Sequence, residues 1–301
     1  MSYTTTIKEE LIRESNHSIS ELAGFIHSTA HLHLRGKGRL ALSFSNEKNV
    51  ILRHFYKTLR SMTDQPITTM QTKELSTRYS LRIEEAGELL EELGLLKDGS
   101  IDFEIKRSLI NTERKKREFI RGVFLGVGII SDPAKDYHLE MSFQRQSLLE
   151  SMLHMLSSYD LDFLPSRRRD KQILYLKKSE SIMDFLTILG AMRSALEFEN
   201  TRILKSVKND VNRQVNCETA NINKTVAAAR KHLDCIEYIQ QHMGLKALSD
   251  SLREVAQLRW EEPELSLKEI GERCDPPLSK SGVNHRLERL MSLCEKLKES
   301  S

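Results

Sequence analysis

An internal repeat is the feature that most constrains the fold of this chain. The order helix, strands, helix, strands, helix occurs twice, first from SISELAGFIHSTAHL (18–32) and again from NTERKKREFIRGVFLGVGII (111–130). The glycines Gly24 and Gly122 occupy matching places, which sets the offset between the two lead helices at 98 residues (122 minus 24). A repeat of this size predicts two α+β halves related by a pseudo-two-fold axis.

The other elements follow from hydrophobic periodicity, since strands alternate in apolar character and helices repeat every 3.6 residues. In the first copy we expect strands at HLHLRG, RLALSFS, ITTMQTK and STRYSLRI, and helices at NEKNVILRHFYKTLRSM and EEAGELLEELGLL. In the second we expect strands at YHLEMSF, LDFLPSR and KQILYLKK, and helices at RQSLLESMLHMLSSY and SIMDFLTILGA. The two halves are thus expected at 1–100 and 101–192.

The two lead helices share a pair of small residues spaced four apart. These are Gly24 and Ser28 in the first copy, and Gly122 and Gly126 in the second. Residues at i and i+4 lie on one helix face, and small ones allow an approach closer than the usual ~8–10 Å between helix axes. We therefore expect the two lead helices to pack directly on each other.

The C-terminal part is expected to be wholly helical. Residues 193–244 read as a connector of two long polar helices, and 245–301 as a small final domain. In that domain Ser266 and Glu269 form an S-x-x-E capping box, and DPPL ends the helix because proline cannot continue it. A longer amphipathic helix starts at Ser279. This order is that of a helix-turn-helix.

The start of the last helix carries side chains of the types that reach phosphates and base edges. We expect DNA contacts from Ser266, Lys280, Ser281, Asn284, His285, Arg286 and Arg289. The alternative is a plain three-helix bundle used for protein contact. Residues 245–301 hold ten Lys/Arg and eleven Asp/Glu, so only the last helix, and not the domain, is basic.

A second basic cluster lies on an expected strand pair. RRRDKQILYLKK (167–178) holds six positive charges and one negative charge. Basic side chains in such a run attract a phosphate backbone, which suggests contacts from Arg167, Arg168, Arg169 and Lys171. An ordinary solvated face is the alternative interpretation of the same run.

Bulk composition excludes several classes of protein. The chain has 301 residues, of which 39% are hydrophobic and 30% charged, as in an ordinary soluble globular protein. It contains no apolar run of about 18 residues that would suggest a membrane span. The cysteines follow no metal-site spacing, and they are Cys217, Cys235, Cys274 and Cys294. We expect a cytoplasmic protein with reduced thiols and no cofactor.

His27, His31 and His33 are close in sequence and could share faces of a helix and a strand, where imidazoles can bind a metal. No acid or cysteine accompanies them, and the change from helix to strand falls between them. Surface or hydrogen-bonded histidines are the preferred interpretation, and no metal site is expected.

Three stretches resemble the WhiA family, sporulation and cell-division regulators of Gram-positive bacteria. IRGVFLGVGIISDPAKDYHLEM (120–141) is similar to the family's second motif region, and NINKTVAAARKHLDCIEYI (221–239) to its connector. LSLKEIGERCDPPLSKSGVNHRLERL (265–290) is similar to its helix-turn-helix and is the most specific of the three. The resemblance covers essentially the whole chain. It implies a degenerate LAGLIDADG homing-endonuclease body joined to a DNA-binding tail. It further implies a nucleoid-associated regulator that binds promoter DNA, with RNA polymerase or another transcription factor as a further partner.

The acid of a LAGLIDADG helix is its eighth residue. Aligning LAGFIHSTA puts Thr29 there, and aligning IRGVFLGVG puts Val127 there. Cleavage by such enzymes needs carboxylates to hold Mg²⁺, so the resemblance implies a scaffold without the chemistry. Asp132 and Asp136, just past the second helix, could restore a site only by an unusual shift. A residual metal-dependent nuclease and a protein-interaction scaffold stay open as alternatives.

Overall fold

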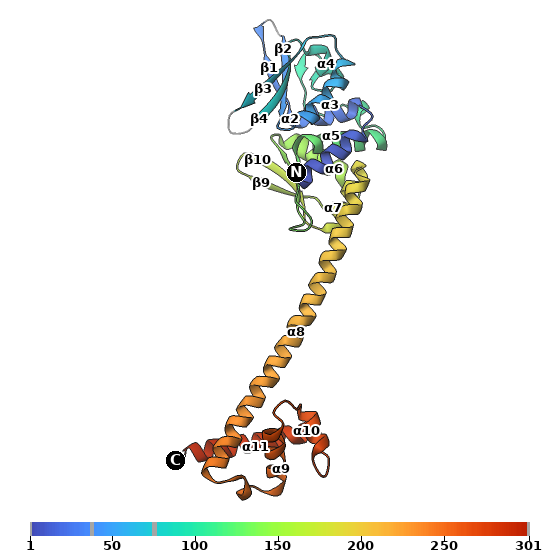
Figure 1. Ribbon diagram of the computed structural model, residues 1–301. Coiled ribbons are helices and arrows are strands. Elements are labelled where there is room, and N and C mark those ends of the chain that lie inside the picture. The colour runs from blue at the N-terminus through green and yellow to red at the C-terminus, as the bar shows by residue number, and fades with distance from the viewer. Residues whose placement is uncertain (1, 37–38, 74–76, 300–301) are drawn as a thin grey trace. The chain divides into compact units, whose positions relative to one another are not determined.

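The computed structural model describes residues 2–36, 39–73 and 77–299. The chain forms two compact units, residues 1–206 and 207–301, and Figure 1 labels many of their elements. The change from one unit to the next falls inside the predicted connector. The finer division into 1–100, 101–192, 193–244 and 245–301 stays a prediction.

The two predicted α+β halves are present in the first unit, and their sheets have the same strand order. The first half contains α2 (Ile19–Thr29), β1 (His31–Leu34), β2 (Leu40–Asn46), α3 (Asn49–Arg60), β3 (Ile67–Lys73), β4 (Thr77–Ile83), α4 (Gly87–Glu92), β5 (Leu96–Lys97) and β6 (Ser100–Ile101). The second contains η2 (Arg107–Leu109), α5 (Glu113–Val127), β7 (Gly128–Ile130), β8 (Leu139–Phe143), α6 (Gln146–Ser157), β9 (Leu164–Arg168), β10 (Lys171–Leu176) and α7 (Ser179–Leu189). The orders β1-β2-β4-β3 and β7-β8-β10-β9 correspond strand for strand. The predicted fold class is therefore confirmed.

Each sheet buries one face under helices of its own half. In the first sheet Leu42 pairs with Ile83 and Phe44 with Leu81, and all four side chains are at most 3% exposed. In the second, Met141 pairs with Leu174, and both are fully buried. Because side chains alternate along a strand, the residues between these positions point to the opposite, open face of each sheet.

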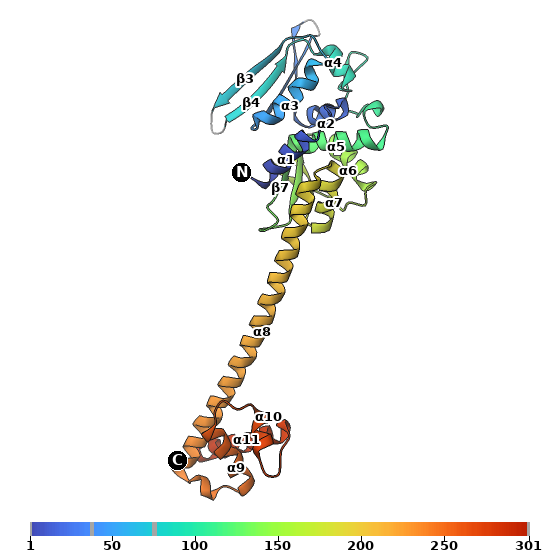
Figure 2. The same cartoon turned by 45° about the vertical axis from the view of Figure 1, so that its right-hand side comes forward.

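Helices α2 and α5 pack directly against each other, as the small residues predicted, and both views show them side by side (Figures 1 and 2). A Cβ added at Gly24 would lie 2.0 Å from the Phe119 carbonyl oxygen, and one at Gly122 would lie 1.9 Å from the Glu21 carbonyl oxygen. Residues 21 and 119 differ by the same 98 positions as the glycines, so the two contacts are pseudo-symmetric. Any larger side chain would force the helix backbones apart.

Helix α1 (Tyr3–Arg13) was missing from the sequence prediction. Its Ile7 and Leu11 are fully buried in the core of the first unit. Its Glu10 carboxylate accepts hydrogen bonds from the backbone nitrogens of Arg193 (2.8 Å) and Ser194 (2.9 Å). These nitrogens lie in the first turn of α8 (Met192–His242), where they have no hydrogen-bond partner within the helix. The Glu10 side chain of α1 therefore caps α8.

The prediction of two connector helices was wrong, because both belong to one helix, α8 (Met192–His242), of 51 residues. No glycine or proline occurs within it, so nothing in its backbone chemistry ends the first stretch before the second begins.

The second unit has a core of its own, formed by the end of α8 and three further helices. These are α9 (Asp250–Glu261), α10 (Leu267–Arg273) and α11 (Lys280–Glu299), preceded by η3 (Leu245–Ala247). Val283, Leu287, Leu290 and Cys294 of the predicted apolar stripe on α11 are at most 3% exposed. In the part of the chain that the structure describes, no helix is long and apolar enough to cross a membrane.

Candidate nucleic-acid interface

Thr29 and Val127, at the two degenerate acid positions, are the last residues of α2 and α5. A Cβ on Gly126 would lie 2.7 Å from the Thr29 Cγ2 atom, so the two helix ends are in contact there. The Thr29 hydroxyl donates to the Phe25 carbonyl oxygen at 2.7 Å and is thus used within its own helix. Valine offers no atom to a metal. Neither helix end presents a carboxylate.

Asp132 and Asp136 lie in the exposed loop between β7 and β8. Each carboxylate accepts a hydrogen bond from a backbone nitrogen nearby in the same loop, that of Ala134 (2.9 Å) and Tyr137 (2.8 Å) respectively. Among the described residues, no group of three or more His, Cys, Asp or Glu side chains could hold a metal ion. Two carboxylates of a surface turn therefore give no metal cluster at the helix ends.

The three histidines have separate environments. His27 is 1% exposed, and its Nε2 lies 2.9 Å from the Leu93 carbonyl oxygen. Burial lowers the pKa of His27 to about 4, so the ring is neutral at physiological pH. His31 is exposed on β1, and His33 Nε2 lies 2.7 Å from Ser43 Oγ on the neighbouring strand. These are the surface and hydrogen-bonded histidines preferred above.

A buried charge cluster between the halves was not predicted. The Glu21 carboxylate of α2, fully buried, contacts His54 Nε2 of α3 (2.7 Å) and the Arg121 guanidinium of α5 (2.6 Å), and it accepts from Ser15 Oγ (2.9 Å). Burial alone would raise the pKa of the Glu21 carboxyl, but the hydrogen bond from His54 and the charge of Arg121 lower it. Glu21 is thus an ionised group that joins α2 to α5, at the opposite end of α2 from Thr29.

The four basic residues of the second predicted cluster are all exposed, but they do not share one face. Lys171 on β10 pairs with Arg168 on β9. Arg167 belongs to the next pair along the two strands, with Gln172, and neighbouring pairs point to opposite faces of the sheet. Leu174, two residues beyond Gln172, is buried under the helices. By strand alternation Arg168 and Lys171 therefore point to the open face of the sheet, and Arg167 points to the other. Arg169 lies in the turn, at a φ of 54°.

The open face of the first sheet also carries basic residues, which the sequence analysis missed. Arg78 and Arg82 alternate with the inward-facing Leu81 and Ile83 on β4. Both take part in ion pairs at the surface, Arg82 with Glu84 (2.7 Å) and Arg78 with Glu47 (3.9 Å). The alternation in STRYSLRI was the available signal.

In the second unit, α10 and α11 are joined by a tight turn. The predicted capping box is present, since Ser266 Oγ accepts from the Glu269 nitrogen and the Glu269 carboxylate accepts from the Ser266 nitrogen. The backbone nitrogen of Leu278 donates to the Gly271 carbonyl oxygen at 2.8 Å, and a Cβ on Gly271 would lie 2.2 Å from the Leu278 oxygen. Only glycine permits this closeness, so Gly271 helps to set the geometry between the two helices.

The polar residues at the start of α11 divide into two groups. Lys280, Ser281, His285 and Arg289 are exposed. Ser281, His285 and Arg289 are four apart and so form one row along the helix, on the side away from the buried Val283 and Leu287. A helix that enters a major groove by this side would present a hydroxyl, an imidazole and a guanidinium to the bases.

Within the exposed group, Ser281 Oγ is hydrogen-bonded to Ser279 Oγ at 3.0 Å. The remaining residues predicted to contact DNA also have bonds within the protein. Arg286 donates to the Ser251 carbonyl oxygen (3.2 Å) and lies 3.7 Å from the Glu254 carboxylate, so it ties α11 to α9. Asn284 Nδ2 donates to Glu288 Oε1 at 2.8 Å. Ser266 is occupied in its capping box.

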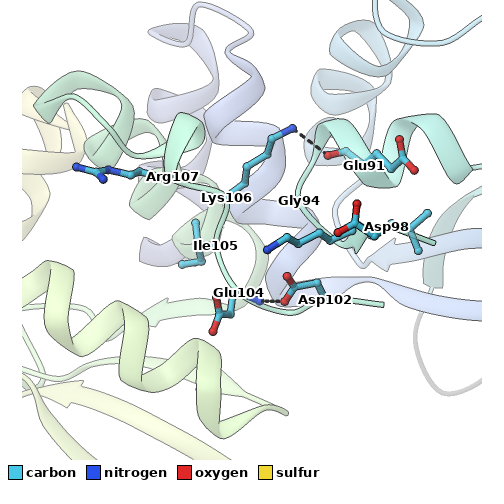
Figure 3. A pocket seen from close by; sticks show the side chains of 10 residues that line it. Glu91, Gly94, Asp98, Asp102, Glu104, Ile105, Lys106 and Arg107 are labelled. Carbon is cyan, nitrogen blue, oxygen red and sulfur yellow. Dashed lines mark hydrogen bonds between the residues drawn. The ribbon is translucent and has the colours of Figure 1, made fainter. Parts of the chain in front are cut away.

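A cavity of about 530 Å³ lies at the connection between the two halves, around the β5–β6 hairpin (Figure 3). Its lining mixes both signs of charge, including Asp98, Asp102, Glu104, Lys106 and Arg107. Lys106 Nζ donates to the Glu91 carbonyl oxygen (3.2 Å), and Asp102 Oδ1 accepts from the Glu104 nitrogen (2.9 Å). Because neither sign of charge dominates the lining, the cavity does not favour a particular ligand.

Comparison with known proteins covers the chain from end to end. A model of the WhiA N-terminal LAGLIDADG-like domain matches residues 15–96, one of the WhiA LAGLIDADG-like domain matches 116–208, and one of the WhiA C-terminal HTH domain matches 211–294. The chain is 37% identical over 308 aligned residues to a protein named probable cell division protein WhiA from Staphylococcus aureus strain USA300, covering 99% of this chain and 98% of the relative. The corresponding protein of strain JH9 gives the same figures.

Solved structures agree with these matches. The structure is similar to that of full-length DUF199/WhiA from Thermotoga maritima, with a TM-score of 0.59, 26% identity and 98% coverage of each chain. The N-terminal LAGLIDADG domain of DUF199/WhiA matches 63% of this chain and 92% of its own length, with a TM-score of 0.50 and 22% identity, and supports the fold alone. With a family model on each part and a relative of this similarity over its full length, the chain belongs to the WhiA family.

Proposed function

We propose that this protein is a sequence-specific DNA-binding regulator of transcription that acts in cell division, chromosome segregation or sporulation. The exposed row Ser281, His285 and Arg289 on α11 carries the proposal, because it places three groups capable of hydrogen bonds to base edges on one helix face. Lys280, exposed beside the row, suits a phosphate contact. The name of the Staphylococcus aureus relatives, probable cell division protein, supports the biological setting.

In this proposal the LAGLIDADG-like body binds DNA or a partner and does not cleave DNA. The threonine and valine at the two acid positions support this, since a hydroxyl already donated within its helix and an alkyl group do not hold Mg²⁺. Arg168 and Lys171 on the open sheet face are the candidates for added phosphate contacts. A residual metal-dependent endonuclease is the alternative that these positions disfavour.

Association with the nucleoid and contact with RNA polymerase or another transcription factor belong to the same proposal. A scaffold that contacts only proteins is the competing possibility. The DNA-binding regulator and the protein-only scaffold differ in whether α11 discriminates between DNA sequences.

The test is a genome-wide map of DNA bound by the chain, followed by binding of the purified chain to the mapped sites and to shuffled sequences at physiological salt. We expect binding to the mapped sites to be at least about 10³-fold tighter, as for specific DNA-binding proteins. Equal affinity for mapped and shuffled DNA would exclude sequence-specific recognition.

A further inference from the structure

Helix α8 carries an apolar stripe that no element of the described chain covers. Nine of its large apolar side chains are 50–71% exposed, namely Met192, Leu196, Ile203, Leu204, Val207, Val211, Val215, Ile222 and Val226. Each lies 11 positions from another member, as Met192 does from Ile203 (203 minus 192). Eleven residues make three turns of about 3.67 residues, so the stripe runs nearly straight along the helix.

The helix around this stripe has little else to stabilise it. Every residue in 206–228 is exposed. The stretch is also rich in asparagine and β-branched residues, which are poor helix formers. Most helices in proteins gain their stability from packing an apolar face. A surface that covers the stripe would therefore supply packing that the described part of the chain does not give residues 206–228.

We propose that the stripe is an interface between two copies of this chain, which pair through their α8 helices. From Met192 to Val226 the stripe extends about 51 Å at 1.5 Å per residue. A partner must offer an apolar face of similar length and repeat. Within the described chain α8, with 51 residues, is far longer than α11 with 20, the next in length. A second copy supplies the matching stripe by symmetry, in an isologous two-fold contact.

The charges beside the stripe favour an antiparallel pair. One flank carries Glu197, Lys208 and Arg230 at multiples of 11 positions, and it changes from acidic to basic along the helix. In an antiparallel pair this flank meets itself in reverse, and a register that sets Glu197 of each copy against Arg230 of the other overlaps the two stripes over residues 201–226. In a parallel pair the flank meets the opposite flank at the same height, which sets Glu197 against Glu199 and Lys208 against Asp210 of the second copy. The first of these two contacts repels and the second attracts, whereas the antiparallel register has the attractive contact without the repulsive one.

The test is sedimentation velocity of the full chain over a wide concentration range. We expect a monomer–dimer equilibrium, and we expect Val215→Lys with Ile222→Lys to raise the dissociation constant at least about tenfold. The matched control is Asn209→Lys with Asn216→Lys, which adds the same charge to the opposite face of α8 and should change dimerisation far less. Lysine is a better helix former than valine or isoleucine, so the stripe variant keeps its helix.

Two further measurements test the antiparallel orientation of the dimer and the stability of α8. Glu197→Lys should weaken the dimer, and Glu197→Lys with Arg230→Glu should restore it. Amide hydrogen exchange across 206–228 should slow as concentration rises. A chain that stays monomeric at every concentration would overturn the proposal, as would a dimer unaffected by the stripe variant. A stripe dimer that the charge exchange fails to restore would overturn the antiparallel arrangement.

Discussion

The paired ends of α2 and α5 and the start of α11 differ in how far they expose polar side chains. At the paired ends the Thr29 hydroxyl is bonded within its helix and Val127 is apolar. At the start of α11, Ser281, His285 and Arg289 are exposed in one row. The contrast teaches that close backbone packing can hold two helix ends together without a carboxylate at either of them.

The largest effect is expected on the stability of the first unit, when the packing of α2 against α5 is disrupted. Gly122→Val should destabilise the first unit by more than about 4 kcal/mol, because its Cβ would overlap the Glu21 carbonyl oxygen and the α2 backbone has little room to move. Thermal unfolding followed by circular dichroism measures this. Gly87→Ala, where an added Cβ meets nothing within 4 Å, is the control and should change stability by less than about 0.5 kcal/mol. Equal effects at both glycines would contradict the close helix contact.

The second largest effect is expected at the buried carboxylate. Glu21→Gln should cost about 3–5 kcal/mol at neutral pH, because Arg121 loses its charge partner in a buried site. The pKa of the Glu21 carboxyl is lowered in the folded chain. The stability that ionised Glu21 contributes is thus fully present at pH values above the pKa of about 4.3 that the carboxyl has in the unfolded chain. This stability is lost as the pH falls through the lower pKa of the folded chain.

The melting temperature of the wild type should therefore fall more steeply on acidification than that of Glu21→Gln. Glu85→Gln, which alters an exposed pair with Arg39, serves as control and should cost at most about 1 kcal/mol. Parallel melting curves across the acidic range would rule out a stabilising, ionised Glu21.

Substitutions at the start of α11 are expected to change the affinity for DNA and not the stability of the fold. Asn284→Ala with His285→Ala should reduce discrimination between specific and shuffled DNA by about 1–3 kcal/mol for each of the two side chains that binds a base. Ser292→Ala, further along the exposed side of α11, is the control. Fluorescence anisotropy with both DNAs measures the change. Wild-type discrimination in the double variant would mean that these residues do not read bases.

The smallest effect is expected from the open sheet face. Arg168→Gln with Lys171→Gln should weaken binding to all DNA sequences alike and reduce the slope of log affinity against log salt by about 0.9 for each phosphate that the variant no longer neutralises. Arg167→Gln with Arg169→Gln removes equal charge away from that face and should leave the slope nearly unchanged. If both pairs act equally, overall charge and not the sheet face attracts the DNA.

Local patterns were sufficient to predict the first sheet, three of the four strands of the second, the contact of α2 with α5 and the capping box of Ser266. Each of these depends on residues within one element or on a repeat visible in the chain. The fourth strand, β7, was wrongly included in the predicted lead helix 111–130. Helix α1 was not predicted because three threonines, which are poor helix formers, follow Tyr3 in its first turn, and the helix depends on burial of Ile7 and Leu11.

The remaining features depend on tertiary contacts. Glu21 and Arg121 are 100 residues apart and meet only when α2 packs on α5. Arg168 could not be separated from Arg167 without the register of β9 against β10. Arg286 also bonds Ser251 and Glu254 of another helix, which the sequence does not show, and its contact with DNA stays a prediction. The sequence identified which residues were polar, and the fold determines which of them are already bonded.

One measurement tests the central claim most directly. The full chain is incubated with its mapped DNA and Mg²⁺ or Mn²⁺, and the same samples are analysed by footprinting and on a denaturing gel. The account predicts a protected site and intact strands, because α11 binds while Thr29 and Val127 leave the helix ends without carboxylates. Metal-dependent cleavage that survives repurification and disappears with a chelator would contradict it.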